Sequence, residues 1–342
     1  MELNTMIKLK DYMEQSLVDK ALEEGGRIEP LIIPNDKSGG LGLCNPSIFK
    51  MKAKSSYLVN VRNVSYYLHH CVGEQKYQTP WGPLNYVRPD NDPYLRTDNF
   101  ICDFSLRNNK LTNPRKLDTS KFPKQPEWDF VGLEDARIVE WDGKMYMTGV
   151  RRFAPKGKGR MVLSEVNITK KSVKEVQRYV IEPPELDAYC EKNWMPILDR
   201  PFHYVKWSNP LQIVKVDIKT GTTTMVFESK ESLDLQLDPR GSSQVIPWKD
   251  GTYLAITHEC DYWHNKKNDR DAQYYHRFMQ WDKDWNLINH SKPYKFMDGR
   301  IEFCCGMAMH PDNNDVYVTF GFQDNSAYLA HIPIAVIEDI WL

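Results

Sequence analysis

The feature that most constrains the fold is a long succession of short apolar runs, each bounded by a turn signal. Runs such as Arg137–Trp141 and Lys144–Gly149 are separated by Asp142-Gly143, and similar glycine-containing turns recur along the chain. Only one stretch, close to the start, has helical periodicity. Strands of this length at steady spacing are typical of a sandwich, a barrel or a propeller. The sequence therefore predicts an all-β fold.

A loose internal repeat favours the propeller among these three architectures. Several hairpins share the form of an apolar run, a turn with Gly or Asn, and an apolar run with an aromatic residue. Examples are Ile138–Gly149, Val245–Thr257 and Met307–Phe320. Their spacing fits blades of roughly 40 to 50 residues. Five such units fill Leu41 to Ile332, so we expect one five-bladed β-propeller domain over residues 41–342.

An N-terminal amphipathic helix is expected before the propeller. Apolar residues recur at helical spacing from about Asn4 to Glu24, and Gly25-Gly26 supplies a stop. Residues 1–40 are therefore assigned to this helix and a lead-in. The sequence leaves open whether the helix caps the propeller or mediates a dimer, and it does not indicate the oligomeric state.

Composition narrows the classes of partner. The net charge of −1 argues against a nucleic-acid binder that works by charge alone, although a nucleic acid stays open as an acceptor. Seven cysteines without C-x-x-C spacing, and a start that lacks a signal-peptide core, predict a cytoplasmic protein with reduced thiols. No run approaches the roughly 18 apolar residues of a membrane helix. His258-Glu259 lacks the H-E-x-x-H spacing of a zinc protease, so no metal is expected there. No cofactor is expected either.

The most informative motif is Gly132-Leu133-Glu134-Asp135-Ala136-Arg137, which leads into an alternating strand, a turn and a second strand. Side chains two apart on a strand share a face. Alternation therefore predicts that Asp135 and Arg137 point together and that Glu134 points away. A carboxylate beside an arginine suits proton transfer or sugar-hydroxyl binding, and it equally suits a structural salt bridge.

The stretch from Gly132 to Gly149 resembles the G-x-E-D-P-R strand–turn–strand signature of glycoside hydrolase family 130, five-bladed propeller mannoside phosphorylases and hydrolases. Ala136 stands where the family has proline. Further segments resemble the family in order and spacing: Leu43–Ile48, Val59–Arg62, Glu191–Pro196, Arg240–Gln244, Tyr253–Glu259, Ile301–Gly306 and Phe320–Asn325. The resemblance covers roughly Leu41 to Ile332. The family carries a phosphate-binding arginine in the middle blade. The corresponding strand in this chain is His203–Ser208, which has Lys206 instead. The motif residues of this chain are closer to those of related glycosyltransferases.

The resemblance implies an inverting glycosyl-transfer enzyme, either a glycosyltransferase or a glycoside phosphorylase, with mannose as the default sugar. A hydrolase of the same fold and a non-catalytic glycan-binding propeller are the alternatives. The expected partners are a sugar phosphate or nucleotide-sugar donor and a carbohydrate or glycosylated acceptor.

The resemblance also implies roles for individual residues. Asp135 is the expected acid/base, protonating the glycosidic oxygen through a sugar hydroxyl. The expected substrate-binding residues are Asn45, Arg62, Glu134, Arg137 and Asp324. The expected phosphate or nucleotide-sugar ligands are Arg151, Lys206, Arg240 and His258. Arg151 and Arg152 are adjacent on a strand, so at most one of them can point inward.

Overall fold

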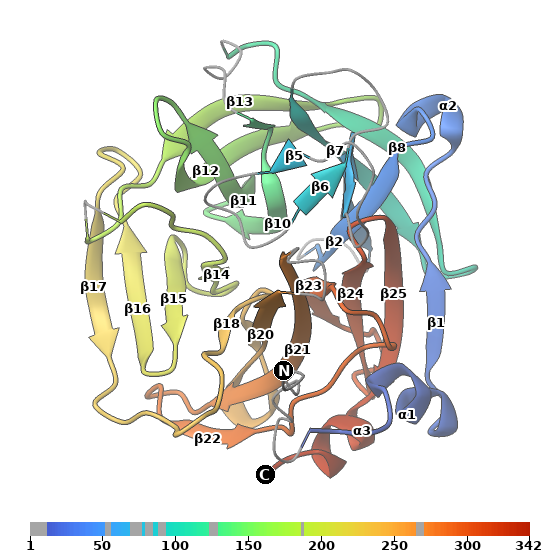
Figure 1. Cartoon of the computed structure of the whole chain (residues 1–342), viewed down its shortest axis with the longest axis vertical. Helices are drawn as coiled ribbons and strands as arrows, with labels where there is room; N and C mark the ends of the chain where they lie inside the picture. The colour runs from blue at the N-terminus through green and yellow to red at the C-terminus, as the bar shows by residue number, and fades with distance from the viewer. Residues whose placement is uncertain are drawn as a thin grey trace.

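The computed structural model describes residues 12–51, 56–68, 77–78, 85–87, 94–122, 129–185, 188–264 and 270–342. Within these residues strands dominate, and their sheets stand around a central axis like the blades of a propeller (Figure 1). The predicted all-β, five-bladed β-propeller is confirmed. No helix in these ranges has the length and apolar character needed to cross a bilayer.

Each blade is an antiparallel sheet whose first strands lie nearest the axis. From the axis outward, blade 1 is β2 (Gly42–Lys50), β3 (Tyr57–Val64), β7 (Leu95–Ser105) and β8 (Lys110–Asp118), and blade 2 is β10 (Glu134–Trp141), β11 (Lys144–Phe153), β12 (Lys158–Ile168) and β13 (Val173–Val180). Blade 3 is β14 (Met195–Pro196), β15 (His203–Ser208), β16 (Leu211–Val216) and β17 (Thr223–Glu228). Blade 4 is β18 (Arg240–Gly241) with β19 (Ile246–Pro247), then β20 (Tyr253–His264), β21 (Arg270–Trp281) and β22 (Leu287–His290). Blade 5 is β23 (Glu302–Met309), β24 (Asp315–Phe322), β25 (Ser326–Pro333) and β1 (Arg27–Pro30).

The remaining elements are short. The strands β4 (Tyr67–Leu68), β5 (Tyr77–Gln78) and β6 (Asn85–Val87) form a small separate sheet, and β9 (Phe130–Val131) pairs in parallel with β7. The helices are α1 (Leu17–Glu23), α2 (Asn35–Ser38), the 3₁₀ turn η1 (Lys249–Gly251) and α3 (Ile334–Asp339).

Blade 5 is completed by a strand from the other end of the chain. β1 pairs antiparallel with β25, Arg27 opposite His331 and Pro30 opposite Tyr328. The backbone hydrogen bonds of this pairing link the first described segment to the last blade. Part of the stretch assigned to the lead-in is therefore hydrogen-bonded into the propeller.

The N-terminal helix is shorter than expected where the structure describes it. Residues 12–16 are not helical, and α1 begins at Leu17, with the Ser16 side chain accepting a hydrogen bond from the Asp19 amide. The Met13 amide donates to the Pro293 carbonyl instead of to a helical partner. Residues 4–11 lie outside the described residues. The prediction of one continuous helix up to Glu24 is wrong at residues 12–16 because tertiary hydrogen bonds replace helical ones there.

Apolar side chains fill the spaces between neighbouring blades. Alternation along β3 sends Val59 and Val61 towards blade 5 and Leu58 towards blade 2, and all three are buried. The same alternation on β10 divides Ile138 and Val139 between the two sides of blade 2. Each sheet is thus apolar on both faces, which is why the strand patterns look nearly continuous rather than strictly amphipathic.

A buried glutamine of blade 4 forms hydrogen bonds to three other blades at the axis. Gln244 donates through Nε2 to the carbonyls of Ile48 at 3.0 Å and Ile138 at 3.3 Å. Its Oε1 accepts from the Met307 amide at 3.1 Å. These backbone groups lie on the inner strands of blades 1, 2 and 5, and Gln244 precedes β19 of blade 4. The side chain therefore supplies hydrogen bonds that inner strand edges lack.

Replacing this glutamine should destabilise the whole propeller. We expect Gln244→Leu to lower the free energy of unfolding by about 3–5 kcal/mol, because three buried backbone groups lose their partners at about 1–3 kcal/mol each. Urea unfolding measures the change. The matched variant Gln212→Leu removes a single hydrogen bond to Glu228 near the surface and should cost less than about 1 kcal/mol. Equal losses in the two variants would contradict the role of Gln244.

Candidate active site

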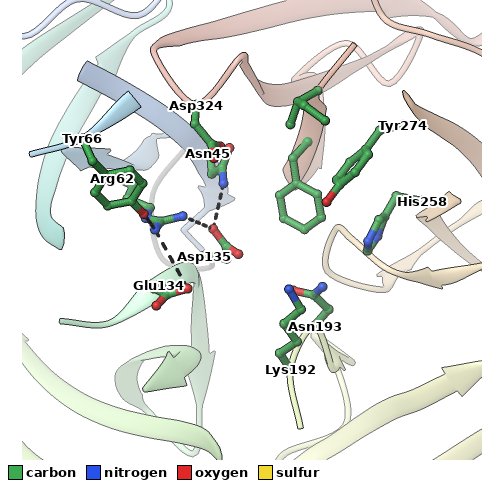
Figure 2. Close-up of a pocket in the computed structure, with 12 residues that line it drawn as sticks. Asn45, Arg62, Tyr66, Glu134, Asp135, Lys192, Asn193, His258, Tyr274 and Asp324 are labelled. Atoms are coloured by element: carbon green, nitrogen blue, oxygen red, sulfur yellow. Dashed lines mark hydrogen bonds and ion pairs between the residues drawn. The ribbon is translucent and has the colours of Figure 1, made fainter. Parts of the chain in front are cut away.

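A polar cavity opens at one end of the axis, and every blade or the segment leading into it contributes side chains (Figure 2). The cavity has a volume of about 70 Å³. It is lined by Asn45, Arg62, Tyr66, Glu134, Asp135, Lys192, Asn193, His258, Tyr274, Ile301, Phe303 and Asp324. One water needs roughly 10–15 Å³ of such space, so the cavity holds a few waters or the reacting edge of a larger ligand.

Asp135 is held at the centre of this cavity by two donors on the same oxygen. Arg62 Nη1 and Asn45 Nδ2 each lie 2.8 Å from Asp135 Oδ1. No described residue donates a hydrogen bond to Oδ2. One oxygen of the carboxylate is thus fixed by the protein, and the other is available to a ligand.

Arg62 is itself fixed on several sides. Its Nε donates to Thr97 Oγ1 at 3.2 Å, and its Nη2 donates to the Tyr66 hydroxyl. Glu134 Oε2 lies 4.0 Å from the same Nη2. The guanidinium is almost completely buried, at 4% exposure, so its charge acts on the neighbouring carboxyls with little screening by water.

A β-bulge aims Asp135 into the cavity. The pairing of β10 with β11 shifts register between Glu134 and Arg137, and Asp135 has φ of +50°. As a result Glu134 and Asp135 both line the cavity, and Arg137 does not. The prediction that Asp135 and Arg137 share a face while Glu134 points away is wrong, because a bulge interrupts the alternation.

Left-handed backbone recurs at the cavity. Asn45, Asn193 and Asp324 have φ of +43°, +63° and +49°. Asn and Asp tolerate this region better than other residues with a Cβ, which explains why these types occupy these positions. Such backbone, at a cost of order 1–3 kcal/mol per residue, is typical of functional sites.

The two aspartates in the cavity have opposite pKa shifts. Burial by itself would raise the pKa of Asp135, but the Arg62 guanidinium and the Asn45 amide outweigh it and hold the pKa below its usual range. Burial raises the pKa of Asp324 to about 6, with Arg62 opposing and Asp135 and Glu134 reinforcing the shift. Asp135 is therefore ionised at neutral pH, and Asp324 exchanges its proton near pH 6. Such a pair of carboxyls suits acid–base chemistry.

His258 forms part of the opposite wall. Burial, together with repulsion from His276, Arg240 and Lys192, lowers its pKa well below the ordinary value, so the imidazole is neutral at pH 7. Its ring lies 4.8 Å from Phe303 between centroids. Nδ1 is buried with no hydrogen-bond partner among the described residues. A neutral imidazole can donate one N–H to a ligand but adds no positive charge.

A second cavity, here called the basic pocket, adjoins the first through Lys192 and Asn193, which line both. Its volume is about 370 Å³, and its cations are Arg152, Lys192, Lys206 and Arg240. Lys206 is paired with Glu185 at 3.0 Å and Glu191 at 3.6 Å. Lys192 is exposed and has no ion-pair partner in the described part of the chain. The basic pocket suits an anionic group attached to a ligand in the central cavity.

The structure brings together most of the residues that the sequence singled out. Those lining the central cavity are Asn45, Arg62, Glu134, Asp135, His258 and Asp324. Lys206 and Arg240 line the basic pocket instead.

Two of the expected ligands lie elsewhere. Arg137 is fully buried at the axis, where its Nε and Nη2 donate to the Ser242 carbonyl at 2.8 and 2.5 Å and its Nη1 to the Asp135 carbonyl at 2.6 Å. It positions the backbone of Asp135 and does not line the cavity. Arg151 lines a different cavity, between blades 1 and 2.

Sequence reasoning missed several residues of the cavity wall. Lys192 and Asn193 stand in the segment Glu191–Pro196, which resembles the family. No sequence pattern, however, indicates that their side chains face the axis. Tyr66, Tyr274 and Phe303 lie within or just beyond strands, and no sequence pattern distinguishes them from core aromatics.

Comparison with solved structures identifies the fold. No protein-family model and no curated protein matches the chain. A β-1,2-mannobiose phosphorylase from Listeria innocua, in complex with β-1,2-mannobiose, superposes with a TM-score of 0.52 at 12% identity, covering 92% of this chain and 93% of that one. MPT-4, a mannose phosphorylase from Leishmania mexicana in complex with a phosphate ion, gives 0.51 at 12% identity, covering 92% of each chain. The chain shares the propeller fold of these two structures. Identity this low shows the propeller and nothing finer.

The shifted pKa of Asp324 predicts a pH-dependent stability. The folded pKa of about 6 lies above the ordinary 3.8, so folding takes up a proton between these values and stability falls as pH rises through them. Asp324→Asn should therefore stabilise the protein at pH 7 and have little effect at pH 4. The full shift corresponds to about 3 kcal/mol, and we expect about 1–2 kcal/mol because the side chain is partly open to water.

Urea unfolding at pH 4 and pH 7 measures this difference. The exposed variant Asp284→Asn should change stability at neither pH. A destabilised Asp324→Asn protein at pH 7 would contradict the raised pKa.

Proposed function

We propose that this protein is an inverting glycosyl-transfer enzyme, a glycosyltransferase or glycoside phosphorylase, with Asp135 as the acid/base. The observation that carries the proposal is an ionised carboxylate with one oxygen open to a cavity that continues into a basic pocket. A base for an acceptor hydroxyl and a place for an anionic leaving group are the two requirements of transfer from a phosphorylated donor.

In the synthetic direction the proton moves from the acceptor to Asp135. As the acceptor oxygen attacks the anomeric carbon, its proton goes to Asp135 Oδ2, directly or through a sugar hydroxyl. The bond from the anomeric carbon to the phosphate oxygen breaks on the opposite face, and the phosphate leaves with the electron pair. In the reverse direction the same carboxyl returns the proton to the glycosidic oxygen, by microscopic reversibility.

The remaining residues of the cavity hold the sugar. Asn45, Glu134 and Asp324 offer amide and carboxyl groups to sugar hydroxyls, and Arg62 keeps Asp135 ionised and oriented. Phe303 and Tyr274 provide aromatic surface on the opposite wall, which suits the apolar face of a pyranose. The structural likeness to mannoside phosphorylases makes mannose the first sugar to test.

We expect the donor phosphate to bind beside Lys192 and Arg240. Arg62 is already engaged by Asp135 and Tyr66, and Lys206 is paired with Glu185 and Glu191. Lys192 is the cation shared by both cavities, so it is the best placed to meet a phosphate on the anomeric carbon. A pocket of about 370 Å³ has more room than a phosphate group needs, so GDP-mannose and mannose 1-phosphate should be assayed side by side.

A hydrolase of the same fold is the second candidate. An ionised Asp135 beside Asp324, whose pKa is raised to about 6, is also the pairing of base and acid that an inverting glycosidase requires. Release of free mannose from mannosides, without transfer from either phosphorylated donor, would favour this candidate.

Asp135→Asn tests the acid/base assignment. Asn keeps a hydrogen-bond acceptor for Asn45 and Arg62 but cannot take a proton, so we expect turnover to fall by at least about 10²-fold. Product formation with each donor measures the effect, and circular dichroism confirms that the fold is retained. The control Asp142→Asn, in the exposed turn of the same hairpin, should keep full activity. If wild type and Asp135→Asn bind glycans equally well and neither turns them over, the result would point to a glycan-binding propeller.

Lys192→Gln tests the route of the leaving group. Removing its charge should raise KM for the phosphorylated donor by roughly tenfold, the equivalent of about 1.4 kcal/mol, since a hydrogen bond to a charged group is worth about 1.5–3 kcal/mol. Affinity for unphosphorylated mannosides should stay the same. Lys215→Gln, on the exposed side of blade 3, is the control. An unchanged KM in Lys192→Gln would exclude this lysine from donor binding.

A further inference from the structure

A third cavity lies between blades 1 and 2, on the side of blade 2 away from the basic pocket. Its volume is about 880 Å³, and its wall includes Tyr94, Leu117, Phe122, Gly132, Arg151 and Arg178. Leu133 lines it as well, and Gly132 and Leu133 come directly before Glu134 in the chain. We call it the blade 1–2 cavity. It shares no lining residue with the central cavity or the basic pocket.

Arg151 is buried in this wall without the partners that a buried guanidinium needs. It is 4% exposed, and its Nε has no hydrogen-bond partner. Its closest carboxylate oxygen in the described structure is Glu175 Oε2, at 3.7 Å, which is too long for a hydrogen bond. No described residue accepts a hydrogen bond from Arg151. Most buried polar groups are hydrogen-bonded, so this exception calls for a missing partner.

Glu175 already accepts three hydrogen bonds from other residues and lies beyond hydrogen-bonding distance of Arg151. Arg178 Nε and Nη2 bind its two oxygens at 2.8 and 2.6 Å, and Ser164 Oγ donates to Oε1 at 2.7 Å. Two arginines thus share one carboxylate, and Arg151 has no hydrogen-bonded carboxylate among the described residues. Burial and repulsion from Arg178 lower the pKa of Arg151 to about 10, so it is still charged at neutral pH.

The rest of the wall is partly apolar. Arg178 lies 4.5 Å from the centre of the Phe122 ring, and Tyr94, Leu117 and Leu133 add further apolar surface. Polar and charged residues complete the wall, among them Arg96, Asp98, Lys116 and Asp118. A cavity that combines fixed charged donors with apolar surface suits a small organic ligand.

We propose that the blade 1–2 cavity binds an organic anion, a phosphate or carboxylate carried on a body with an apolar face, whose oxygens accept hydrogen bonds from Arg151. A planar guanidinium matches both oxyanions in a bidentate geometry, so the anion chemistry is shared between sugar phosphates and sugar acids. This inference does not rest on the proposed function, because no residue of the central cavity takes part.

The adjacent pair Arg151-Arg152 places one arginine on each side of blade 2. Arg151 lines the blade 1–2 cavity and Arg152 lines the basic pocket, as alternation along β11 requires. The protein therefore has two anion-binding cavities separated by one sheet, and substitutions in one can be tested while the other stays intact.

The experiment compares Arg151→Met with wild type in calorimetry and thermal unfolding. The probes are inorganic phosphate, mannose 6-phosphate, glucuronate and neutral mannose. In the wild type we expect at least one of the three anions to bind at a site that Arg151→Met weakens at least tenfold and that Lys206→Gln leaves unchanged. Phosphate-bearing and carboxylate-bearing probes distinguish the two sources of anion. Anomalous diffraction from tungstate, a heavy tetrahedral oxyanion, should place a peak beside Arg151 in the wild type and none there in the variant.

The stability of the unliganded variant separates a binding role from a structural one. Arg115 is an equally buried arginine in blade 1, but it is fully paired, with Ile101, Thr169 and Asp103 as acceptors. In anion-free buffer, Arg115→Met should lower the midpoint of thermal unfolding, whereas Arg151→Met should leave it unchanged or raise it. Equal destabilisation by both variants, or anion binding that Arg151→Met does not weaken, would overturn the proposal.

Discussion

The structure depends on hydrogen bonds that close the inner edges of the blades. An innermost strand in a propeller pairs on one side only, and its other edge faces the axis, where Ser47, Ser242 and Gln244 are fully buried. Polar side chains from other blades take the place of a neighbouring strand. Ser47 Oγ donates to the Ala136 carbonyl, Thr319 Oγ1 to the Pro46 carbonyl and Ser242 Oγ to the Cys304 carbonyl, at 2.7, 2.7 and 2.5 Å. Together with the buried glutamine they fix the distances between the blades.

The central cavity forms at the end of the axis where these hydrogen bonds between the inner strands stop. Towards one end of the axis β2 and β10 bulge, and Asn45 and Asp135 take up left-handed backbone that turns their side chains towards the opening. Arg137 connects the two regions, since it holds the Asp135 carbonyl and the Ser242 carbonyl together. The carboxylate that faces the cavity is therefore built on the same hydrogen-bond system that holds the propeller closed, which limits how far it can move.

The sequence predicted the fold well because strand length, turn signals and apolar faces are local properties that the propeller repeats. It also marked Asp135, Arg62 and Asn45, since they stand in short segments with a recognisable order. It failed where the outcome depends on geometry between strands. The bulge that turns Glu134 towards the cavity and keeps Arg137 away from it, buried at the axis, leaves no trace in apolar spacing. Likewise, alternation separates Arg151 from Arg152, but only the packing of blades decides which cavity each one reaches.

The distribution of charge in the central cavity bears on how the proposed phosphorylated donor would be oriented. The carboxyls of Glu134, Asp135 and Asp324 gather on one side of the central cavity around a single buried cation, Arg62 (Figure 2). That cation is already bound to Asp135, so an anion placed there would meet repulsion with no free donor to compensate. Lys192 stands on the opposite side, where the cavity meets the basic pocket. For the glycosyl transfer that we propose, this arrangement favours one orientation of the donor, with its sugar towards the aspartates and its phosphate towards the lysine.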